Sequence, residues 1–286
     1  MRNLFMRRRD AICVMCLVPL LAQNAAPPRA ARADEREAIT PTDAPIVLFN
    51  GKDLTDWYVW MKDTGTSDPR SVFSVRDGLL HVSGDGLGGL TTEKAYRDYH
   101  LIAEWKWGTR TWKNREKSTR DSGILVHGIG PDGGYSGTWL CSFESQIIEG
   151  GCGDFIVVAG NLADGSPAPL KLTAEIELDR DGETVWKRGG ERRTFEKGRV
   201  NWFGRDPDWK DELGFRGAQD VEKRAGEWNR HEVICDGPRI INIINGTVVN
   251  EAVEVSPAAG KIQIQTELAE ILFRKIELRP LNRTAR

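Results

Sequence analysis

Short stretches in which apolar and polar residues alternate are the feature that most limits how this chain can fold. In residues 170–178 (LKLTAEIEL) every second side chain is apolar, which places the apolar side chains on one face of an extended strand. Hardly any segment shows the 3.6-residue period of an amphipathic helix. A sheet with one apolar face needs a second layer to pack against, so the pattern predicts an all-β fold, a β-sandwich of two antiparallel sheets.

Turn residues divide the chain into predicted strands. An Arg-Asp-Gly turn at 76–78 joins strands at 72–75 and 79–82, and Asn245-Gly246 joins 240–244 to 247–249. Such pairs accept the positive φ angles of a tight hairpin turn. Further strands are predicted at 99–107, 123–127, 138–148, 155–159, 170–178, 228–236, 261–266 and 271–278.

One long segment, residues 185–227, departs from this pattern. It mixes aromatic residues (Trp186, Trp202, Phe203, Trp209, Phe215) with arginines (Arg192, Arg193, Arg199, Arg205, Arg216) among Gly and Asp. Long insertions in compact domains are usually functional, so we expect an excursion from the sandwich that covers a sugar cleft by stacking and by guanidinium hydrogen bonds. The alternative is that the aromatic residues only hold the loop against the sandwich.

The first 33 residues have the organisation of an export signal. Arg7-Arg8-Arg9 precede an apolar run from Ala11 to Ala22, and a stretch of small residues ends at Ala31-Arg32-Ala33. This run is shorter than the ~20 residues that cross a bilayer. We therefore expect a signal peptide over residues 1–33, a leader over 34–45 and a periplasmic or extracellular domain over 46–282, with no membrane attachment after cleavage. An uncleaved anchor is the alternative.

Three cysteines follow the predicted signal: Cys141, Cys152 and Cys235. The first two are close enough in sequence to belong to one hairpin, and an exported domain lies in an oxidising compartment. A Cys141–Cys152 disulfide and two buried thiols are both compatible with the sequence, because only the Cβ geometry separates them.

Charge and tryptophan content narrow the class of ligand. Forty basic and 42 acidic residues give a formal net charge of −2, so no global field attracts nucleic acid, and we expect no nucleic-acid partner. Ten Trp outnumber nine Phe and four Tyr. This favours flat apolar platforms at the surface, which suit a carbohydrate ligand.

Two side chains of the predicted strand 138–148 are candidates for chemistry. The two-residue period puts Glu144 and Gln146 side by side on one face. A carboxylate in a strand centre is unfavourable unless it is exposed or functional, so Glu144 is a candidate base and Gln146 a candidate substrate-positioning group. A solvated outer face is the alternative.

His127 and Arg274 are the other candidates. His127 ends a strand that begins with Asp121, and histidine can act as acid, base or metal ligand, although a lone histidine is more often structural. In the last strand, alternation puts Arg274 on one face with Glu270, Leu272 and Ile276. A guanidinium among apolar neighbours needs an acceptor and is suited to a developing oxyanion.

Several motifs occur in order over about 46–282: LFNGKDLTDW at 48–57, DSGIL at 121–125, ExQIIEG at 144–150, WN at 228–229, NG at 245–246, GKIQIQ at 260–265 and FRxI at 273–276. Together they resemble the bacterial 3-keto-disaccharide hydrolase domain family. The resemblance implies a concanavalin-like, laminin-G-like jelly-roll sandwich with a cleft on its concave sheet. It also implies an exported enzyme acting on glycosides whose sugar carries a ketone at carbon 3.

Two positions depart from the family pattern. His127 stands where many members have arginine and would bring a divalent metal ion or a different base, while Lys275 stands where asparagine usually follows the arginine of the last strand. Apart from this metal ion, the resemblance implies no cofactor.

The implied reaction is an elimination. The ketone at carbon 3 makes the carbon-2 proton acidic, and its abstraction gives an enediolate that expels the anomeric group; water addition completes a net hydrolysis. This chemistry needs a base and an oxyanion stabiliser, which we assign to Glu144 or His127 and to Arg274 or a bound divalent cation. The substrate-binding residues are then Gln146, Asp121, Gln265 and Trp139.

These assignments predict that Glu144, His127 and Arg274 line one cleft, although they lie on strands far apart in the sequence. The rival interpretation is a non-catalytic carbohydrate-binding module of the same fold, which would account for the Trp content and the cleft without a base.

Overall fold

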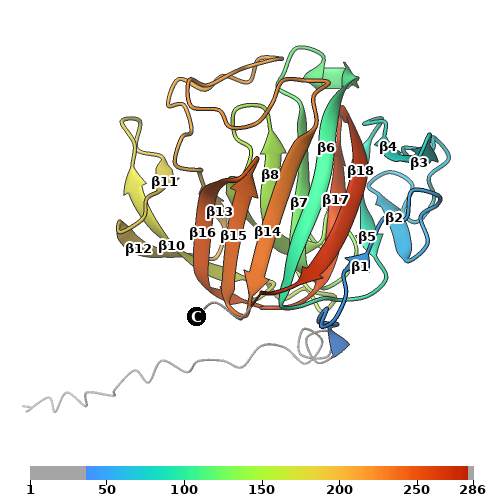
Figure 1. Ribbon diagram of the computed structural model, residues 1–286, viewed down its shortest axis with the longest axis horizontal. Coiled ribbons are helices and arrows are strands. Elements are labelled where there is room, and N and C mark those ends of the chain that lie inside the picture. The colour runs from blue at the N-terminus through green and yellow to red at the C-terminus, as the bar shows by residue number, and fades with distance from the viewer. Residues whose placement is uncertain (1–36, 283–286) are drawn as a thin grey trace, which may run out of the picture.

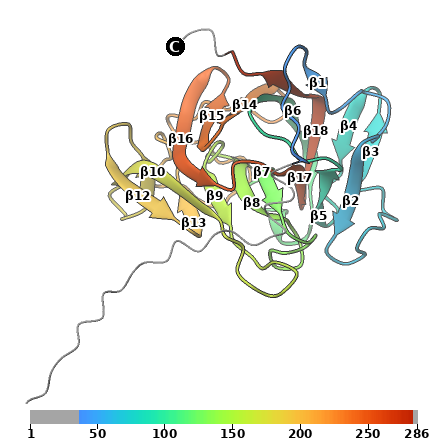
Figure 2. The same cartoon turned by 90° about the horizontal axis from the view of Figure 1, so that it is seen from below.

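A computed structural model describes residues 37–282, which form two antiparallel sheets packed face to face (Figure 1; Figure 2 shows the two layers from below). The predicted signal peptide lies outside the described residues. Within 37–282, the eleven-stranded sheet has the order β11-β10-β16-β15-β14-β6-β18-β4-β3, with β1 paired to β18 and β12 to β10. The seven-stranded sheet has the order β13-β9-β8-β7-β17-β5-β2. The all-β jelly-roll sandwich is therefore confirmed.

The strands have the following bounds: β1 Ile46–Val47, β2 Trp57–Met61, β3 Phe73–Arg76, β4 Leu79–Val82, β5 Leu87–Thr92, β6 Tyr99–Thr111, β7 Asp121–Ile129, β8 Cys141–Ile148, β9 Phe155–Val158, β10 Lys171–Leu178, β11 Thr184–Trp186, β12 Glu191–Phe195, β13 Gly198–Val200, β14 Asn229–Asp236, β15 Arg239–Ile244, β16 Thr247–Ser256, β17 Lys261–Glu267 and β18 Ala269–Pro280. A short 3-10 helix, η1 (Lys113–Arg115), follows β6.

The two predicted hairpin turns are present. Asp77 and Gly78 join β3 to β4 with φ angles of 51° and 75°, and Asn245 and Gly246 join β15 to β16 with 48° and 84°. Both central residues thus adopt the positive φ of a type I′ turn, which matches the twist of the flanking strands.

The space between the sheets is filled by large apolar side chains, among them Trp105, Phe143, Phe155 and Phe273. Trp107 and Trp202 are also fully buried. Tryptophan side chains therefore contribute to the core as well as to the surface, because an indole ring covers more area than any other side chain in a wide sandwich.

Within residues 37–282, no helix has the length and apolar character needed to span a bilayer.

One residue of the predicted leader, Ile39, is attached to the domain. Ile39 pairs with the Tyr96 segment through two backbone hydrogen bonds, from its own N–H to Ala95 and from the Arg97 N–H to Ile39, and its side chain packs on the core. The polar composition concealed this one apolar anchor.

Part of the predicted excursion belongs to the sheets, which corrects its start at 185. β11 and β12 pair with β10, and β13 pairs with β9. β12 alternates weakly in polarity because it is a largely exposed edge strand with no buried residue. The irregular part covers residues 202–228, here called the 202–228 loop, which runs over one end of the sandwich (Figure 1).

Alternation fails in the last strand. Ile271, Phe273 and Ile276 all lie in the core, whereas Ile276 was expected on the face of Arg274. The register between β18 and β6 shifts between Phe273 and Lys275, and the extra residue of such a bulge reverses the side-chain alternation.

Cys141, Cys152 and Cys235 are buried free thiols, so the disulfide alternative is not realised.

Candidate active site

A cavity of about 300 Å³ lies on the outer face of the seven-stranded sheet. Its floor comes from β7, β8, β9 and β17, whose opposite faces carry core residues such as Ile124, Phe143 and Ile264. The lining residues are Arg115, Asp121, Tyr135, Trp139, Glu144, Gln146, Ile156, Val158, Arg199, Gln265 and Glu267. Five predicted site residues thus lie together: Glu144, Gln146, Asp121, Gln265 and Trp139.

Gly123 of β7 forms the centre of the floor between Glu144 of β8 and Gln265 of β17. A Cβ atom at this glycine would clash with the Oε1 atoms of both Glu144 and Gln265. Both oxygens are buried and have no hydrogen-bond partner among the described residues. The missing side chain at Gly123 is what lets a carboxyl and an amide approach across one strand.

Three carboxyl groups share this cavity. Glu144 is only 4% exposed, and burial together with the charges of Glu267 and Asp121 raises its pKa well above the usual range. Burial and the charge of Glu267 likewise raise the pKa of Asp121, against the opposing effect of Arg115. A raised pKa makes the ionised carboxylate a stronger base, so these buried carboxyl groups are candidates for proton transfer.

Two arginines balance the carboxyl groups in different ways. Arg115 of η1 is committed to an ion pair with Asp121 and to a second one with Glu267, 3.2 Å between Nη2 and Oε1. Arg199 of β13 has one ion pair, at 3.6 Å to Asp154, and 35% of its side chain is exposed. Arg199 is therefore the cation of the site that is more available to a ligand.

Aromatic rings form one wall of the cavity. Tyr135 and Trp139 stack with an interplanar angle of 17° and a centroid distance of 6.1 Å, and the Trp139 Nε1–H donates to the carbonyl of Gly88 at 2.9 Å. The Gln146 Oε1 accepts from the Ile147 N–H at 3.0 Å, which leaves its amide nitrogen for a ligand. A flat wall beside charged and amide groups is typical of sugar recognition.

His127 does not lie in this cavity, which corrects its assignment as base or metal ligand. It is fully buried between the sheets, where its ring lies edge-on to Tyr99 and Phe143 and its Nδ1 is 3.0 Å from the Pro257 carbonyl oxygen. Strict alternation would place it on the site face with Leu125. The register of β7 shifts between Val126 and Ile129, and this bulge, with a φ of 53° at His127, turns the ring inward.

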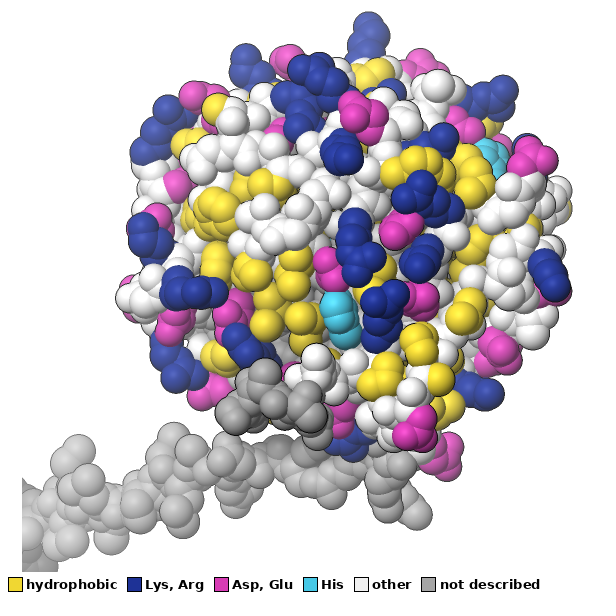
Figure 3. All heavy atoms as spheres, viewed as in Figure 1, with side chains coloured by type: hydrophobic (Ala, Val, Ile, Leu, Met, Phe, Trp, Pro, Cys, Tyr) yellow, Lys and Arg dark blue, Asp and Glu magenta, His cyan; other side chains and the backbone are white. Residues whose placement is uncertain are grey.

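Arg274 also lies away from the cavity, on the outer face of the eleven-stranded sheet. Its Nε bonds to Glu104 at 2.6 Å, and its guanidinium lies 4.6 Å from the ring of Trp228. Basic and acidic side chains interleave on this face (Figure 3). The acceptor of the Arg274 guanidinium is therefore Glu104, in a surface ion pair. The expectation that Glu144, His127 and Arg274 line one cleft is wrong.

The described residues do not fit the divalent cation considered for His127. Among residues 37–282, no three His, Cys, Asp or Glu side chains are arranged as a set of metal ligands. No step of the chemistry below is derived through a metal ion.

Six lining residues were absent from the predicted site: the apolar Ile156 and Val158, and four that carry polar groups, Arg115, Tyr135, Arg199 and Glu267. Glu267 follows Gln265 by two residues in β17, so the period of two could have found it. Arg199 was singled out only as part of the arginine-rich segment. Arg115 and Tyr135 lie outside the strands, and no local pattern indicates their place.

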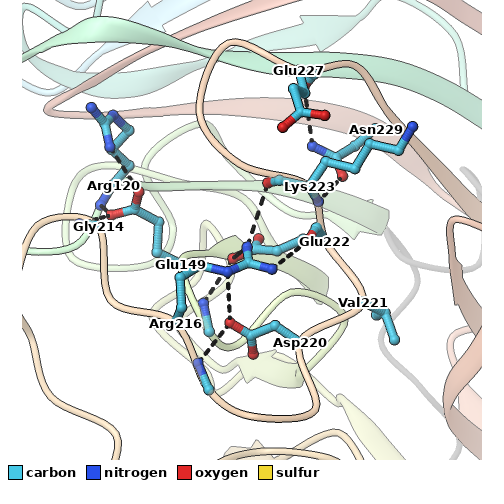
Figure 4. Close-up of polar contacts among 12 residues, drawn as sticks. Arg120, Glu149, Gly214, Arg216, Asp220, Val221, Glu222, Lys223, Glu227 and Asn229 are labelled. Atoms are coloured by element: carbon cyan, nitrogen blue, oxygen red, sulfur yellow. Dashed lines mark hydrogen bonds and ion pairs between the residues drawn. The ribbon is translucent and has the colours of Figure 1, made fainter.

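The 202–228 loop is fastened to the turn after β8 by buried carboxyl groups (Figure 4). Glu149 binds Arg120 at 2.7 Å and accepts from the Gly214 N–H at 2.8 Å. The Glu222 Oε1 accepts from the Gly150 N–H at 2.9 Å. Arg120 is the chain neighbour of the site residue Asp121. The ion pair between Arg120 and Glu149 therefore connects the loop to the site. Trp209 and Phe215 pack beside Gly150, as expected if the aromatic residues hold the loop in place.

Comparison with known proteins agrees with the sequence motifs. Residues 44–279 match the family of 3-keto-alpha-glucoside-1,2-lyase-like domains. No curated protein sequence matches the chain.

Solved structures with a similar fold include a protein from Parabacteroides distasonis described as a glycosyl hydrolase, with 19% identity, a TM-score of 0.47 and coverage of 84% of this chain and 94% of that one. The Bacillus licheniformis β-glucanase has 10% identity, a TM-score of 0.42 and coverage of 84% and 100%. The carbohydrate-binding module CBM66 of Bacillus subtilis has 8% identity and a TM-score of 0.42, and the match covers 78% of this chain and 94% of that one. At these values the structural likeness carries no argument about activity.

Proposed function

This chain belongs to the family of 3-keto-alpha-glucoside-1,2-lyase-like domains, and from that premise we propose that it cleaves glycosides whose sugar unit carries a ketone at carbon 3. The observation that carries the proposal is the buried Glu144 carboxyl, which faces Gln265 across Gly123 in a cavity that also holds Arg199. A general acid–base group, an amide and an available cation are what the elimination requires.

The reaction consists of a proton transfer and one bond cleavage. A base takes the carbon-2 proton, and the electron pair of that C–H bond passes into the enediolate, with negative charge on the carbon-3 oxygen. The pair then forms the double bond between carbons 1 and 2 while the bond from carbon 1 to the leaving oxygen breaks. The protonated base then gives its proton to the leaving oxygen, which restores the base and yields a free alcohol and an unsaturated keto sugar. Water addition to that sugar gives net hydrolysis.

We assign the base to Glu144. Its raised pKa makes the ionised carboxylate a stronger base than an exposed glutamate, and its position above Gly123 leaves one face open to the cavity. The neighbouring Gln146 and Gln265 amides and Asp121 would hold sugar hydroxyls, with the ring against Trp139.

We assign the contact to the enediolate oxygen to Arg199, in place of Arg274. Arg199 lines the cavity and has a single ion pair within residues 37–282, whereas Arg115 is held by Asp121 and Glu267. A partly buried guanidinium beside a developing oxyanion stabilises it more strongly than water does.

The test is Glu144→Gln, which keeps the shape of the side chain and removes its ability to take a proton. Turnover of a 3-keto disaccharide, measured as released sugar, should fall about 10²- to 10⁴-fold with little change in Tm. Exchange of the carbon-2 proton with D₂O, followed by NMR, should be lost in parallel. The exposed Glu116→Gln is the matched control and should behave as wild type.

Two outcomes would contradict this proposal. Full turnover in Glu144→Gln would remove Glu144 from the mechanism. Sugar binding by the wild-type protein without turnover or proton exchange, unaffected by Glu144→Gln, would instead identify a non-catalytic carbohydrate-binding module.

A further inference from the structure

A cavity of about 210 Å³ lies where the 202–228 loop meets β6 and the turn after β8. It shares no lining residue with the candidate active site. We propose that this cavity binds a tetrahedral oxyanion, a phosphate or sulfate group. The proposal goes beyond the proposed function and does not depend on it, because no residue assigned to the glycoside chemistry takes part.

Basic side chains outnumber carboxyl groups in the lining of this cavity. The carboxyl groups are Glu149 and Glu222, and the basic groups are Arg120, Arg216, Lys223 and Arg224. Within residues 37–282, ion pairs hold Arg120 and Arg216, but no carboxylate pairs with Lys223 or Arg224. Two of the four cations are therefore available to an anion.

The two paired arginines are held in place by the loop and the turn (Figure 4). Arg120 binds Glu149 at 2.7 Å, and Arg216 lies 3.4 Å from Asp220 and 3.3 Å from Glu222. The Arg216 Nη2–H also donates to the Glu222 carbonyl at 2.6 Å. Burial raises the pKa of Glu222 to about 8, so at pH 7 its carboxyl is mostly protonated and offsets little of the positive charge.

The buried polar groups of the lining that lack a partner favour the same class of ligand. Trp107 Nε1 and Arg120 Nε are buried donors without an acceptor among the described residues. Glu222 Oε2 is buried and unpartnered as well, and in the protonated carboxyl it can donate. A ligand with acceptor atoms and negative charge complements these donors and the unpaired cations, and guanidinium groups match the oxygens of phosphate and sulfate.

The geometry of the lining favours a tetrahedral anion over a planar carboxylate. The donors come from three separate segments: Trp107 from β6, Arg120 from the residue before β7, and Lys223 and Arg224 from the 202–228 loop. Four oxygens that point in different directions can meet donors from several sides, whereas a carboxylate presents two oxygens in one plane. Binding would add a contact between the loop and the sandwich.

The test is a calorimetric titration of the protein with sodium phosphate at pH 7 and low salt, in a buffer without oxyanions. We expect one saturable site with a Kd of about 1 mM or below. At a tenfold excess over Kd, Tm should rise by about 3–6 °C, because the ligand binds only the folded state. Sulfate should bind similarly, and acetate at least about tenfold more weakly.

Lys223 and Arg224 are exposed, so their substitution changes the cavity without disturbing the core. Lys223→Gln and Arg224→Gln should each weaken phosphate binding at least about fivefold, because each removes a charged donor. Lys210→Gln removes the same charge from an exposed position of the loop outside the cavity and is the matched control. Its Kd should equal that of wild type.

Three outcomes would overturn the proposal. The first is no saturable phosphate binding up to about 10 mM, roughly tenfold above the expected Kd. The second is binding that neither Lys223→Gln nor Arg224→Gln weakens. A Tm rise equal in all variants belongs to this outcome, since phosphate and sulfate stabilise proteins generally by exclusion from their surface. The third is acetate binding as tight as phosphate binding, which removes the tetrahedral ligand.

Glucose 6-phosphate distinguishes a free anion from the same group carried on a sugar. Tighter binding of inorganic phosphate supports a site for a free oxyanion, and tighter binding of glucose 6-phosphate supports a site for a sugar-borne one. In either case Lys223→Gln and Arg224→Gln should weaken the binding, and Lys210→Gln should not.

Discussion

At the scale of single residues, the absent side chain of Gly123 is as important to the site as the carboxyl of Glu144. We predict that Gly123→Ala displaces the Glu144 and Gln265 side chains, because its Cβ would clash with an oxygen of each. A displacement of about 1 Å at a reacting group can lower turnover about 10²-fold. The measurement is kcat for a 3-keto glycoside together with Tm; wild-type kcat in a folded Gly123→Ala variant would contradict the arrangement.

For His127 we predict the opposite: a substitution should change the stability of the protein and leave its turnover unchanged. His127→Asn keeps a residue that tolerates positive φ and a donor for Pro257, but it leaves part of the ring volume empty. We expect a loss of about 1–3 kcal/mol in the free energy of unfolding at pH 7. The turnover of the folded variant should equal that of wild type, and a large loss of turnover would return His127 to the mechanism.

The difference in stability between the wild-type protein and the same variant should depend on pH. Burial lowers the pKa of His127 from 6.5 to about 4. Between these values the unfolded chain binds a proton that the folded protein does not, so the folded state loses stability as the pH falls from 6.5 toward 4. Asparagine does not titrate, so the difference in stability between wild type and His127→Asn should shrink over this range in denaturant titrations.

At the scale of elements, the 202–228 loop depends on a protonated carboxyl. Burial raises the pKa of Glu222 from 4.5 to about 8, with the charge of Asp220 adding to the shift and Arg216 opposing it. The folded protein keeps this proton where the unfolded chain loses it. Stability is therefore full below pH 4.5 and declines as the pH rises through 8.

We predict that Glu222→Gln, which imitates the protonated form, removes this decline. The variant should match wild type near pH 5 and become more stable than it by pH 8, by an amount on the order of a few kcal/mol. Denaturant unfolding at each pH measures the difference. Glu212→Gln, at an exposed position of the same loop, is the control and should run parallel to wild type; parallel curves for Glu222→Gln as well would mean that Glu222 ionises normally.

At the scale of the whole molecule, we propose that the mature protein is exported and begins near Asp34, following the signal organisation of residues 1–33. Ile39, five residues after Asp34 in the sequence, is attached to the domain by backbone hydrogen bonds, so the proposed start lies close to the domain. Amino-terminal sequencing of protein recovered outside the cytoplasm should show this start. An intact Met1 on cytoplasmic protein would show that the interpretation is wrong.

The sequence by itself determined the layers of this molecule and half of its site. The period of two assigns each residue of a strand to one face, which was sufficient to put Glu144 and Gln146 opposite Phe143, and the Asp-Gly and Asn-Gly pairs located two hairpins. The motifs of the family resemblance contain Asp121 and Gln265, and Trp139 was assigned to substrate binding beside them; all three lie in the same cavity. These features are local, or are carried by motifs.

Only the tertiary structure decided where His127, Arg274, Arg115 and Arg199 lie. A bulge depends on how two neighbouring strands pair, so a residue shifted by one position moves to the other face without a signal in its own segment. Arg274 was predicted in a strand and lies in the eleven-stranded sheet, whereas Arg199 was predicted in the excursion 185–227 and lies in the edge strand of the seven-stranded sheet. Which sheet a strand joins is set by long-range pairing and packing, and therefore only the folded chain separates the two arginines.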